Sequence, residues 1–363
     1  MKRRLRNLLF LALYPAGIFR LFSFRNRKKV VILVYHGVTS RKKGAGIRCQ
    51  IGRHVHSGEF RRQLEYLTRR YHILSLPGLV ELMLDGKEIP PYSAVVTLDD
   101  GYRNNYTDAF PLLQSYGVPA TVFLTTSLIG TGKHSWWDRV EASIEASSVG
   151  TIATEVRGRK YAYPLRNDRE KAHAIGEIES VAKRLPEHEK TELVEQVVRA
   201  SKAEPLVMPE ECEFMDWDAV REMRKAGITF GSHTHNHVIL TRVRQDEATQ
   251  EVLVSKQRIE EQLGEKVNLF AYPNGAKGDF SPETKRILKD LGFLCALVMV
   301  PGANDSHSDR YELRRISVSD NDSLAAFVAG LSGFKAFLRR LVPEPSPSAR
   351  PFLPDSRRLY TQF

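Results

Sequence analysis

Cysteine is scarce in this 363-residue sequence, and its three cysteines, Cys49, Cys212 and Cys295, stand far apart. An odd number of widely spaced cysteines argues against a disulfide framework and against a zinc site built from cysteines. No apolar run approaches the roughly 20 residues that a membrane-spanning helix needs. Hydrophobic residues still make up 42% of the chain and charged residues 27%. These proportions exclude wholesale disorder and a polytopic membrane protein, and they favour folded domains with a sizeable core.

Acidic residues are absent from the first 29 positions, which hold nine basic residues. The formal charge of the chain is +11, of which residues 1–29 contribute +9 and residues 335–363 contribute +4, so the middle is slightly acidic. A nucleic-acid-binding protein is expected to carry its basic stripe on the folded domain, so we expect no nucleic-acid partner. Basic ends instead favour a membrane surface or an anionic polymer.

The basic N-terminus also contains an apolar run at 8–22, interrupted at 15–17 by proline, alanine and glycine. We interpret residues 1–29 as a basic apolar membrane-associating segment, interfacial or signal-anchor in type. This predicts a membrane-associated or exported protein of the cell envelope, on an undetermined side. No small-x-small cleavage site is evident, and cleavage stays open. The alternative is a helix packed on the domain. Residues 343–363, rich in proline and serine, predict a mobile tail.

Between these ends, short apolar runs alternate with helical patterns, which predicts parallel strands joined by helices. The expected strands are 30–35, 94–98, 120–124, 228–231, 269–272 and 295–300, with a weaker one at 316–318. Six or seven such units suit an α/β barrel better than an open sheet, and its chemistry would lie where strands end. Residues 139–212 break the rhythm with a hairpin and two amphipathic helices. We interpret them as an insertion that either shapes a substrate groove or covers exposed core.

The first chemical signal is VVTLDDGY, in which an apolar strand ends in Asp99 and Asp100. Neighbours on a strand point in opposite directions, so one carboxylate can bind a cation while the other stays free as a base. A solvated turn at a strand end has the same appearance. The motif therefore needs a partner elsewhere in the chain before it indicates a site.

That partner is GSHTHNH, which follows another short strand and contains His233, His235 and His237. A spacing of four predicts that His233 and His237 lie on one face of a helical turn, with His235 pointing elsewhere. Two histidines and a carboxylate make a metal site with open positions, typical of hydrolytic zinc enzymes. Such a metal lowers the pKa of water to about 7, and a free carboxylate beside that water can take its proton.

A third signal is FAYPNG at 270–275, where proline and glycine force a tight turn at a strand end. Such a turn can present a backbone N–H to a developing oxyanion. Taken alone the motif is weak, because an ordinary turn has the same sequence.

In this order and spacing, TLDDGY, GSHTxxH and YPNG resemble the polysaccharide deacetylases, carbohydrate esterase family 4, with their NodB-homology domain. VYHGV, GVPATVFL and SWWD are similar to one branch of that family, and the resemblance covers roughly residues 30–320. It implies a distorted (β/α)7 barrel at residues 30–330 and hydrolysis of an N-acetyl group from a sugar. It assigns Asp99 as the catalytic base and the Asn274 backbone amide as the oxyanion donor. It assigns the metal, zinc or another divalent transition metal, to Asp100, His233 and His237.

Two departures from the family pattern affect the site. Its third motif usually opens with an arginine two residues before the proline, where this chain has Ala271. Its last motif supplies a histidine as general acid, but the corresponding stretch here reads ELRRISVSD. His36, at the end of the first strand, is one candidate acid, and His307 is a weaker one. For the missing arginine we predict Arg315, because the last strand of a closed barrel adjoins the first, and because this branch of the family tends to carry an arginine there.

The expected function is metal-dependent removal of N-acetyl groups from an N-acetylated glycan or glycolipid of the cell envelope. One alternative keeps the metal site but changes the substrate to a lipid-linked acetamido or formamido sugar or another amide. A further alternative is a non-catalytic glycan-binding barrel, although binding alone does not require a base beside the metal.

Overall fold

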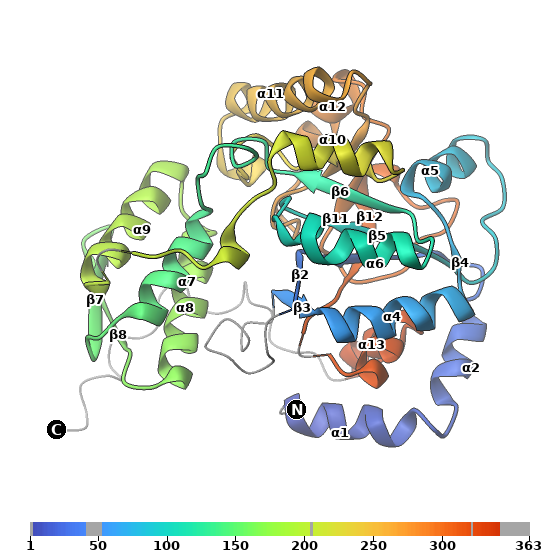
Figure 1. Ribbon diagram of the computed structural model, residues 1–363, viewed down its shortest axis with the longest axis horizontal. Helices are drawn as coiled ribbons and strands as arrows, with labels where there is room; N and C mark the ends of the chain where they lie inside the picture. Colours follow the sequence, from blue (N-terminus) through green and yellow to red (C-terminus); the bar gives the residue numbers. More distant parts are fainter. Residues whose placement is uncertain (1–2, 41–52, 204–205, 321, 342–363) are drawn as a thin grey trace.

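The computed structural model describes residues 3–40, 53–203, 206–320 and 322–341 as one barrel with an insertion (Figure 1). An eight-stranded parallel sheet closes through pairing of β1 with β5, so that seven strands form the barrel and the short β4 (His72–Ile73) stays outside. The barrel strands are β1 (Val31–Tyr35), β5 (Ser93–Leu98), β6 (Ala120–Leu124), β9 (Thr229–Ser232), β10 (Leu269–Ala271), β11 (Cys295–Val298) and β12 (Leu313–Ser317). The predicted α/β fold, a distorted (β/α)7 barrel, is confirmed.

Side chains along most barrel strands alternate between two apolar clusters. Ile32 belongs to the cluster inside the barrel, whereas its neighbour Leu33 packs with the surrounding helices. Both faces of the strands are therefore buried, which explains why they are almost continuously apolar in sequence. Helix α5 (Leu76–Leu84) contributes Leu79 and Val80 to the interior cluster. Cys295 is fully buried in β11, as its apolar run predicts.

Helices cover the outside of the barrel (Figure 1). These are α4 (Ser57–Arg70), α6 (Phe110–Ser115), α10 (Trp217–Lys225), α11 (Gln245–Leu263), α12 (Pro282–Asp290) and α13 (Leu324–Leu331). Helix α4 buries Phe60, Leu64 and Leu67, the apolar face expected from their spacing. Helix α12 begins with a capping box in which Ser281 and Thr284 each bond the other's backbone. Local sequence and packing thus agree around the barrel.

The insertion forms a small unit with its own apolar core. It contains α7 (Trp136–Ala146), the antiparallel hairpin β7 (Thr151–Val156) and β8 (Arg159–Pro164), α8 (Asp168–Ala182) and α9 (Glu187–Ser201). Figure 1 shows it at the left of the barrel. The predicted hairpin and two amphipathic helices are present. Helix α7 begins at Trp136, three residues before the predicted start of the insertion.

Two further short strands lie outside the barrel. Strand β2 (Gly37–Thr39), which follows β1, pairs in parallel with β3 (His54–His56).

The apolar run at 8–22 forms two short helices, α1 (Arg3–Leu13) and α2 (Ile18–Arg25), separated at Pro15 and Gly17. Phe10 and Phe19 are buried against the C-terminal part of the chain, so the alternative of helices packed on the domain is correct for these side chains. In the described part of the chain, no helix has the length and apolar character that crossing a bilayer requires. The predicted tail at 343–363 and Cys49 lie outside the described residues.

Candidate metal centre and catalytic pair

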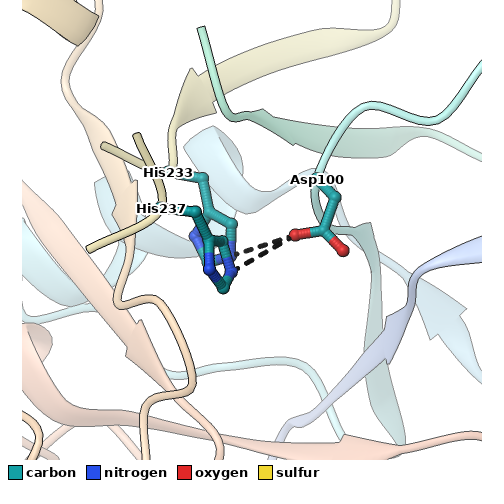
Figure 2. A group of neighbouring side chains, drawn as sticks. All are labelled: Asp100, His233 and His237. Atoms are coloured by element: carbon teal, nitrogen blue, oxygen red, sulfur yellow. Dashed lines mark ion pairs between the residues drawn. The ribbon is translucent and has the colours of Figure 1, made fainter. Parts of the chain in front are cut away.

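Asp100, His233 and His237 converge at the carboxyl end of the barrel strands (Figure 2). The Asp100 Oδ1 atom lies 3.6 Å from His233 Nε2 and 3.5 Å from His237 Nε2. One ligand atom from each residue lies within 4.8 Å of the other two. Asp100 and His233 are buried and His237 is half-buried. The residues that the sequence predicted as metal ligands are thus brought together around one point.

The backbone at this edge of the barrel turns sharply to bring the three ligands together. Positive φ angles occur at Asp100 (74°), Thr234 (63°) and His237 (56°), a conformation that non-glycine residues adopt rarely. The expected helical turn between His233 and His237 was wrong, because this segment is a loop after β9. The left-handed residues Thr234 and His237 turn the loop back on itself. Convergence of the two imidazoles therefore comes from loop geometry and not from helical periodicity.

The donor set fits a divalent transition metal. Asp100 Oδ1 is buried yet accepts no hydrogen bond from the described residues, which is costly for a carboxylate oxygen unless a cation binds it. His233 Nδ1 lies 2.7 Å from the Ala271 carbonyl oxygen. Donation to that carbonyl places the Nε2 lone pair toward Asp100, the usual orientation of a metal-bound imidazole. Burial lowers the pKa of both His233 and His237, which favours the neutral form that binds metal.

The neighbouring carboxylate, Asp99, has a different partner. Arg315 Nη1 lies 2.7 Å from Asp99 Oδ1, and Arg315 Nη2 lies 2.7 Å from Asp99 Oδ2. Arg315 is 1% exposed, and it shares the interior side of β12 with Leu313. Strand β12 pairs with β1 and β1 with β5, so Arg315 reaches across one strand to Asp99. The contact predicted between these residues is confirmed, whereas its catalytic role stays a prediction.

The two adjacent carboxyl groups have opposite electrostatic environments. Burial opposes ionisation of Asp99, but the charge of Arg315 and its hydrogen bonds to the carboxylate outweigh burial and hold the pKa of Asp99 below its ordinary value. Burial, followed by the charge of Asp99, raises the pKa of Asp100 well above its ordinary value. A cation bound to Asp100 would therefore favour its ionised form, whereas Arg315 already favours the ionised form of Asp99.

The turn after β10 places Asn274 at the same edge of the barrel. Asn274 has a φ of 59°, and its side-chain Nδ2 donates to Asp279 Oδ2 at 2.5 Å. Its backbone N–H has no acceptor among the described residues. A Cβ at Gly275 would lie 2.9 Å from the Met299 backbone nitrogen, so only glycine fits there. The turn thus leaves one backbone donor unused at a residue that lines the cleft.

The remaining histidines differ in position. His36 follows β1 and lines the cleft, and burial lowers the pKa of His36 to about 4 despite the opposing charge of Asp99. His36 is thus mostly neutral at pH 7 and would have to gain a proton before acting as an acid, so that role stays a prediction. His235 lies 2.9 Å from Thr126 Oγ1, outside the cluster. His307 is exposed and does not line the cleft.

A cleft of about 250 Å³ opens above these residues, and the insertion forms one of its walls. The insertion supplies Trp136, Trp137, Ala182, Lys183, Leu185, Glu187 and Lys190 to the lining. Arg53 also lines the cleft, and it forms ion pairs with Glu141 and Glu179 of the insertion. Of the two predicted roles of the insertion, shaping a groove is therefore supported by its position.

Trp137 connects this wall to the metal ligands. Its ring lies 4.4 Å from the His237 ring, centroid to centroid, and its Nε1 donates to the Tyr102 hydroxyl at 2.7 Å. That hydroxyl donates to Asp138 at 2.8 Å. Sequence analysis did not assign Trp137 or Arg53 to the site. The SWWD motif contained the signal for Trp137, whereas Arg53 has none, because it belongs to none of the motifs.

Comparison with known proteins agrees with this geometry. The family model described as polysaccharide deacetylase matches residues 86–296, more than half of the chain. The chain is 23% identical over 308 residues to YxkH of Bacillus subtilis (strain 168), whose name assigns it provisionally to the polysaccharide deacetylases. That match covers 85% of this chain and 77% of YxkH.

Two further similarities concern a shorter segment and the fold. The poly-beta-1,6-N-acetyl-D-glucosamine N-deacetylase of Escherichia coli (strain K12) is 36% identical over 67 residues, which cover 18% of this chain and 10% of that protein. The structure of Streptococcus pyogenes deacetylase PplD in complex with acetate superposes with a TM-score of 0.56 at 18% identity. It covers 84% of this chain and 98% of that one, which shows a shared fold.

Proposed function

The chain belongs to the polysaccharide deacetylase family of hydrolases, and we propose that it removes N-acetyl groups from an N-acetylated glycan or glycolipid of the cell envelope. The observation that carries this proposal is the division of labour between two adjacent acids. Asp100 faces two histidines, whereas Asp99 is ionised and held by Arg315. A protein that only binds glycans would need at most the metal ligands, whereas a hydrolase needs both the metal ligands and an ionised base.

Asp100, His233 and His237 would hold a divalent ion, zinc or another transition metal. When bound, that ion supplies Lewis-acid activation of water and of the acetamide carbonyl. The His233–Ala271 hydrogen bond fixes one ligand in the required tautomer and orientation.

Asp99 acts as the general base that accepts the proton of the attacking water. Both of its oxygens bond Arg315, which fixes the carboxylate rotamer and keeps it ionised. Asp99 also lies beside the metal ligands, since its Oδ2 is 4.0 Å from His233 Nε2. General-base catalysis of this kind contributes about 10²–10⁴-fold to the rate.

The Asn274 N–H donates to the oxygen of the acetamide carbonyl as negative charge develops there. A backbone donor at a fixed turn loses no side-chain entropy in this role, and one such hydrogen bond is typically worth about 10²–10³ in rate. The leaving amine then needs a proton. Two groups at the cleft can deliver it, namely Asp99 after it has accepted one, or His36 after protonation.

The cleft also supports a sugar substrate. Trp136 and Trp137 line its wall, and Lys183, Lys190 and Arg242, which also line it, carry hydrogen-bond donors. Aromatic faces pack on the apolar faces of sugar rings, and polar side chains around them bind hydroxyl groups. The poly-N-acetylglucosamine specificity in the name of the Escherichia coli relative supports the same substrate class.

Acetate release from N-acetylglucosamine oligomers, measured with metal content on the same preparation, tests the proposal. We expect metal-dependent acetate release that is abolished by a chelator and restored by zinc or another divalent transition metal. Metal binding without acetate release from any oligomer would favour the alternative of a lipid-linked acetamido or formamido sugar. Oligomer binding by the metal-loaded protein without turnover of either substrate type would favour the non-catalytic glycan-binding barrel.

A further inference from the structure

Exposed apolar side chains gather on three short helices at the two ends of the described chain, α1, α2 and α14 (Phe334–Leu341). Eight large hydrophobic residues are exposed in the described part of the protein, and six of them lie on these helices or in the turn between α1 and α2. These six are Leu11, Tyr14, Leu21, Phe24, Phe337 and Leu341. Leu21 is 69% exposed and Leu341 is 62% exposed. Such a concentration is typical of an interaction surface.

The three helices are held together although they are far apart in sequence. The ring of Phe334 in α14 lies 6.3 Å from that of Phe10, 5.3 Å from that of Phe19 and 5.1 Å from that of Phe22. Asn26 Nδ2, just after α2, donates to the Ser332 carbonyl oxygen at 2.8 Å. This buried aromatic cluster fixes the two ends of the chain into one body. The six exposed hydrophobic residues therefore belong to one structural unit.

The charge on this unit has one sign. Residues 7–29 and 334–341 contain no acidic residue. The exposed cations among them are Arg20, Arg25, Lys28, Lys29, Arg339 and Arg340. This combination fits a bilayer surface with anionic headgroups. The apolar side chains insert between the lipids, and the cationic side chains bind lipid phosphate groups. A second copy of the same surface would place like charges opposite one another, which disfavours self-association.

We propose that α1, α2 and α14 together form a docking surface for an anionic membrane, with the helices lying in the headgroup region. This extends the sequence-based interpretation of residues 1–29 to the C-terminal helix α14, for which sequence analysis noted only the basic charge of residues 335–363. In Figure 1, α1 lies along the lower side of the molecule, beneath α4 and α13, and α2 lies at the lower right beside them. None of the residues that line the cleft lies on these helices, so docking leaves the cleft lining free.

Vesicle co-sedimentation of the full chain tests this surface. The probes are phosphatidylcholine vesicles with and without phosphatidylglycerol. The test variant combines Leu21→Ser, Phe24→Ser and Leu341→Ser, which removes exposed apolar groups without opening the core. The matched control combines Leu84→Ser and Val207→Ser, the two exposed hydrophobic residues outside the surface, which are 47% and 79% exposed. Circular dichroism melting and light scattering check folding and oligomeric state.

We expect the wild type and the control to bind the phosphatidylglycerol vesicles, with binding that weakens as salt rises. The test variant should partition at least tenfold less at an unchanged melting temperature. Equal binding by wild type and test variant would overturn the proposal, as would no binding by the wild type. A wild-type dimer that dissociates in the test variant, without vesicle binding, would assign the surface to self-association instead.

Discussion

Arg315 and Asp99 form a buried bidentate ion pair, with both N–O distances at 2.7 Å. The pair joins β12, the last strand of the barrel, to the end of β5. Each side chain is at most 2% exposed. Two buried charges persist only when each satisfies the other, so this pair fixes both the position and the ionisation of the carboxylate. Ala271 occupies the position where the family usually has an arginine, and Arg315 approaches Asp99 from a different strand.

The first prediction concerns that arginine. Arg315→Lys should lower the turnover number about 10–100-fold, because an ammonium group cannot grip both carboxylate oxygens. Metal content should stay unchanged, since Arg315 bonds none of the three metal ligands. Steady-state kinetics and metal analysis check this. Arg314→Lys, the same change at the exposed neighbouring position of β12, is the control. Equal activity of the two variants would remove Arg315 from the mechanism.

The second prediction separates the histidines of the GSHTHNH motif. His233→Ala and His237→Ala should each lose the metal and all measurable turnover, because each removes one of three ligands. His235→Ala should keep the metal, since His235 bonds Thr126 outside the cluster. Metal analysis of the three purified variants provides the comparison. Full metal occupancy in the first two would show that the ligand assignment is wrong.

The third prediction concerns stability and pH. Burial raises the pKa of Glu141 to about 7 despite its ion pair with Arg53. Between the ordinary pKa of about 4.5 and the raised pKa of about 7, the folded state keeps a proton on Glu141 that the unfolded state has lost. The free energy of unfolding from this group therefore falls as pH rises from about 4.5 to about 7, by at most about 3 kcal/mol.

Glu141→Gln removes this titration and keeps a hydrogen-bond acceptor for Arg53. We compare the free energy of unfolding of the variant with that of wild type at each pH. The difference should favour the variant more at pH 8 than at pH 5. Denaturant unfolding at both pH values measures the difference, with Glu192→Gln at an exposed site of the same insertion as control. A difference between Glu141→Gln and wild type that does not change with pH would contradict the assignment.

The barrel and most of the site could be predicted from the sequence for a physical reason. Parallel strands buried on both faces are continuous apolar runs, and their carboxyl ends meet at one edge. Motifs that follow such runs, as at Asp99, His233 and Asn274, therefore had to converge. Closure of the barrel likewise placed Arg315 within reach of Asp99.

Other features depend on contacts that no local pattern encodes. The loop from His233 to His237 turns through left-handed Thr234 and His237, a conformation for which non-glycine residues carry no sequence signal. Trp137 lines the cleft because the insertion packs beside it, and Arg53, directly before β3, lines it while pairing with Glu141 and Glu179 of the insertion. The packing of Phe334 on Phe10 and Phe19 joins opposite ends of the chain, and charge counts alone could not show it.

The central claim is that adjacent acids divide the work, Asp100 as metal ligand and Asp99 as base. The most direct test measures metal content and acetate release from N-acetylglucosamine oligomers for Asp99→Asn and Asp100→Asn. We predict that Asp99→Asn keeps nearly full metal content yet loses about 10²–10⁴-fold in rate, and that Asp100→Asn loses the metal together with activity. Loss of metal in Asp99→Asn and its retention in Asp100→Asn would contradict the account.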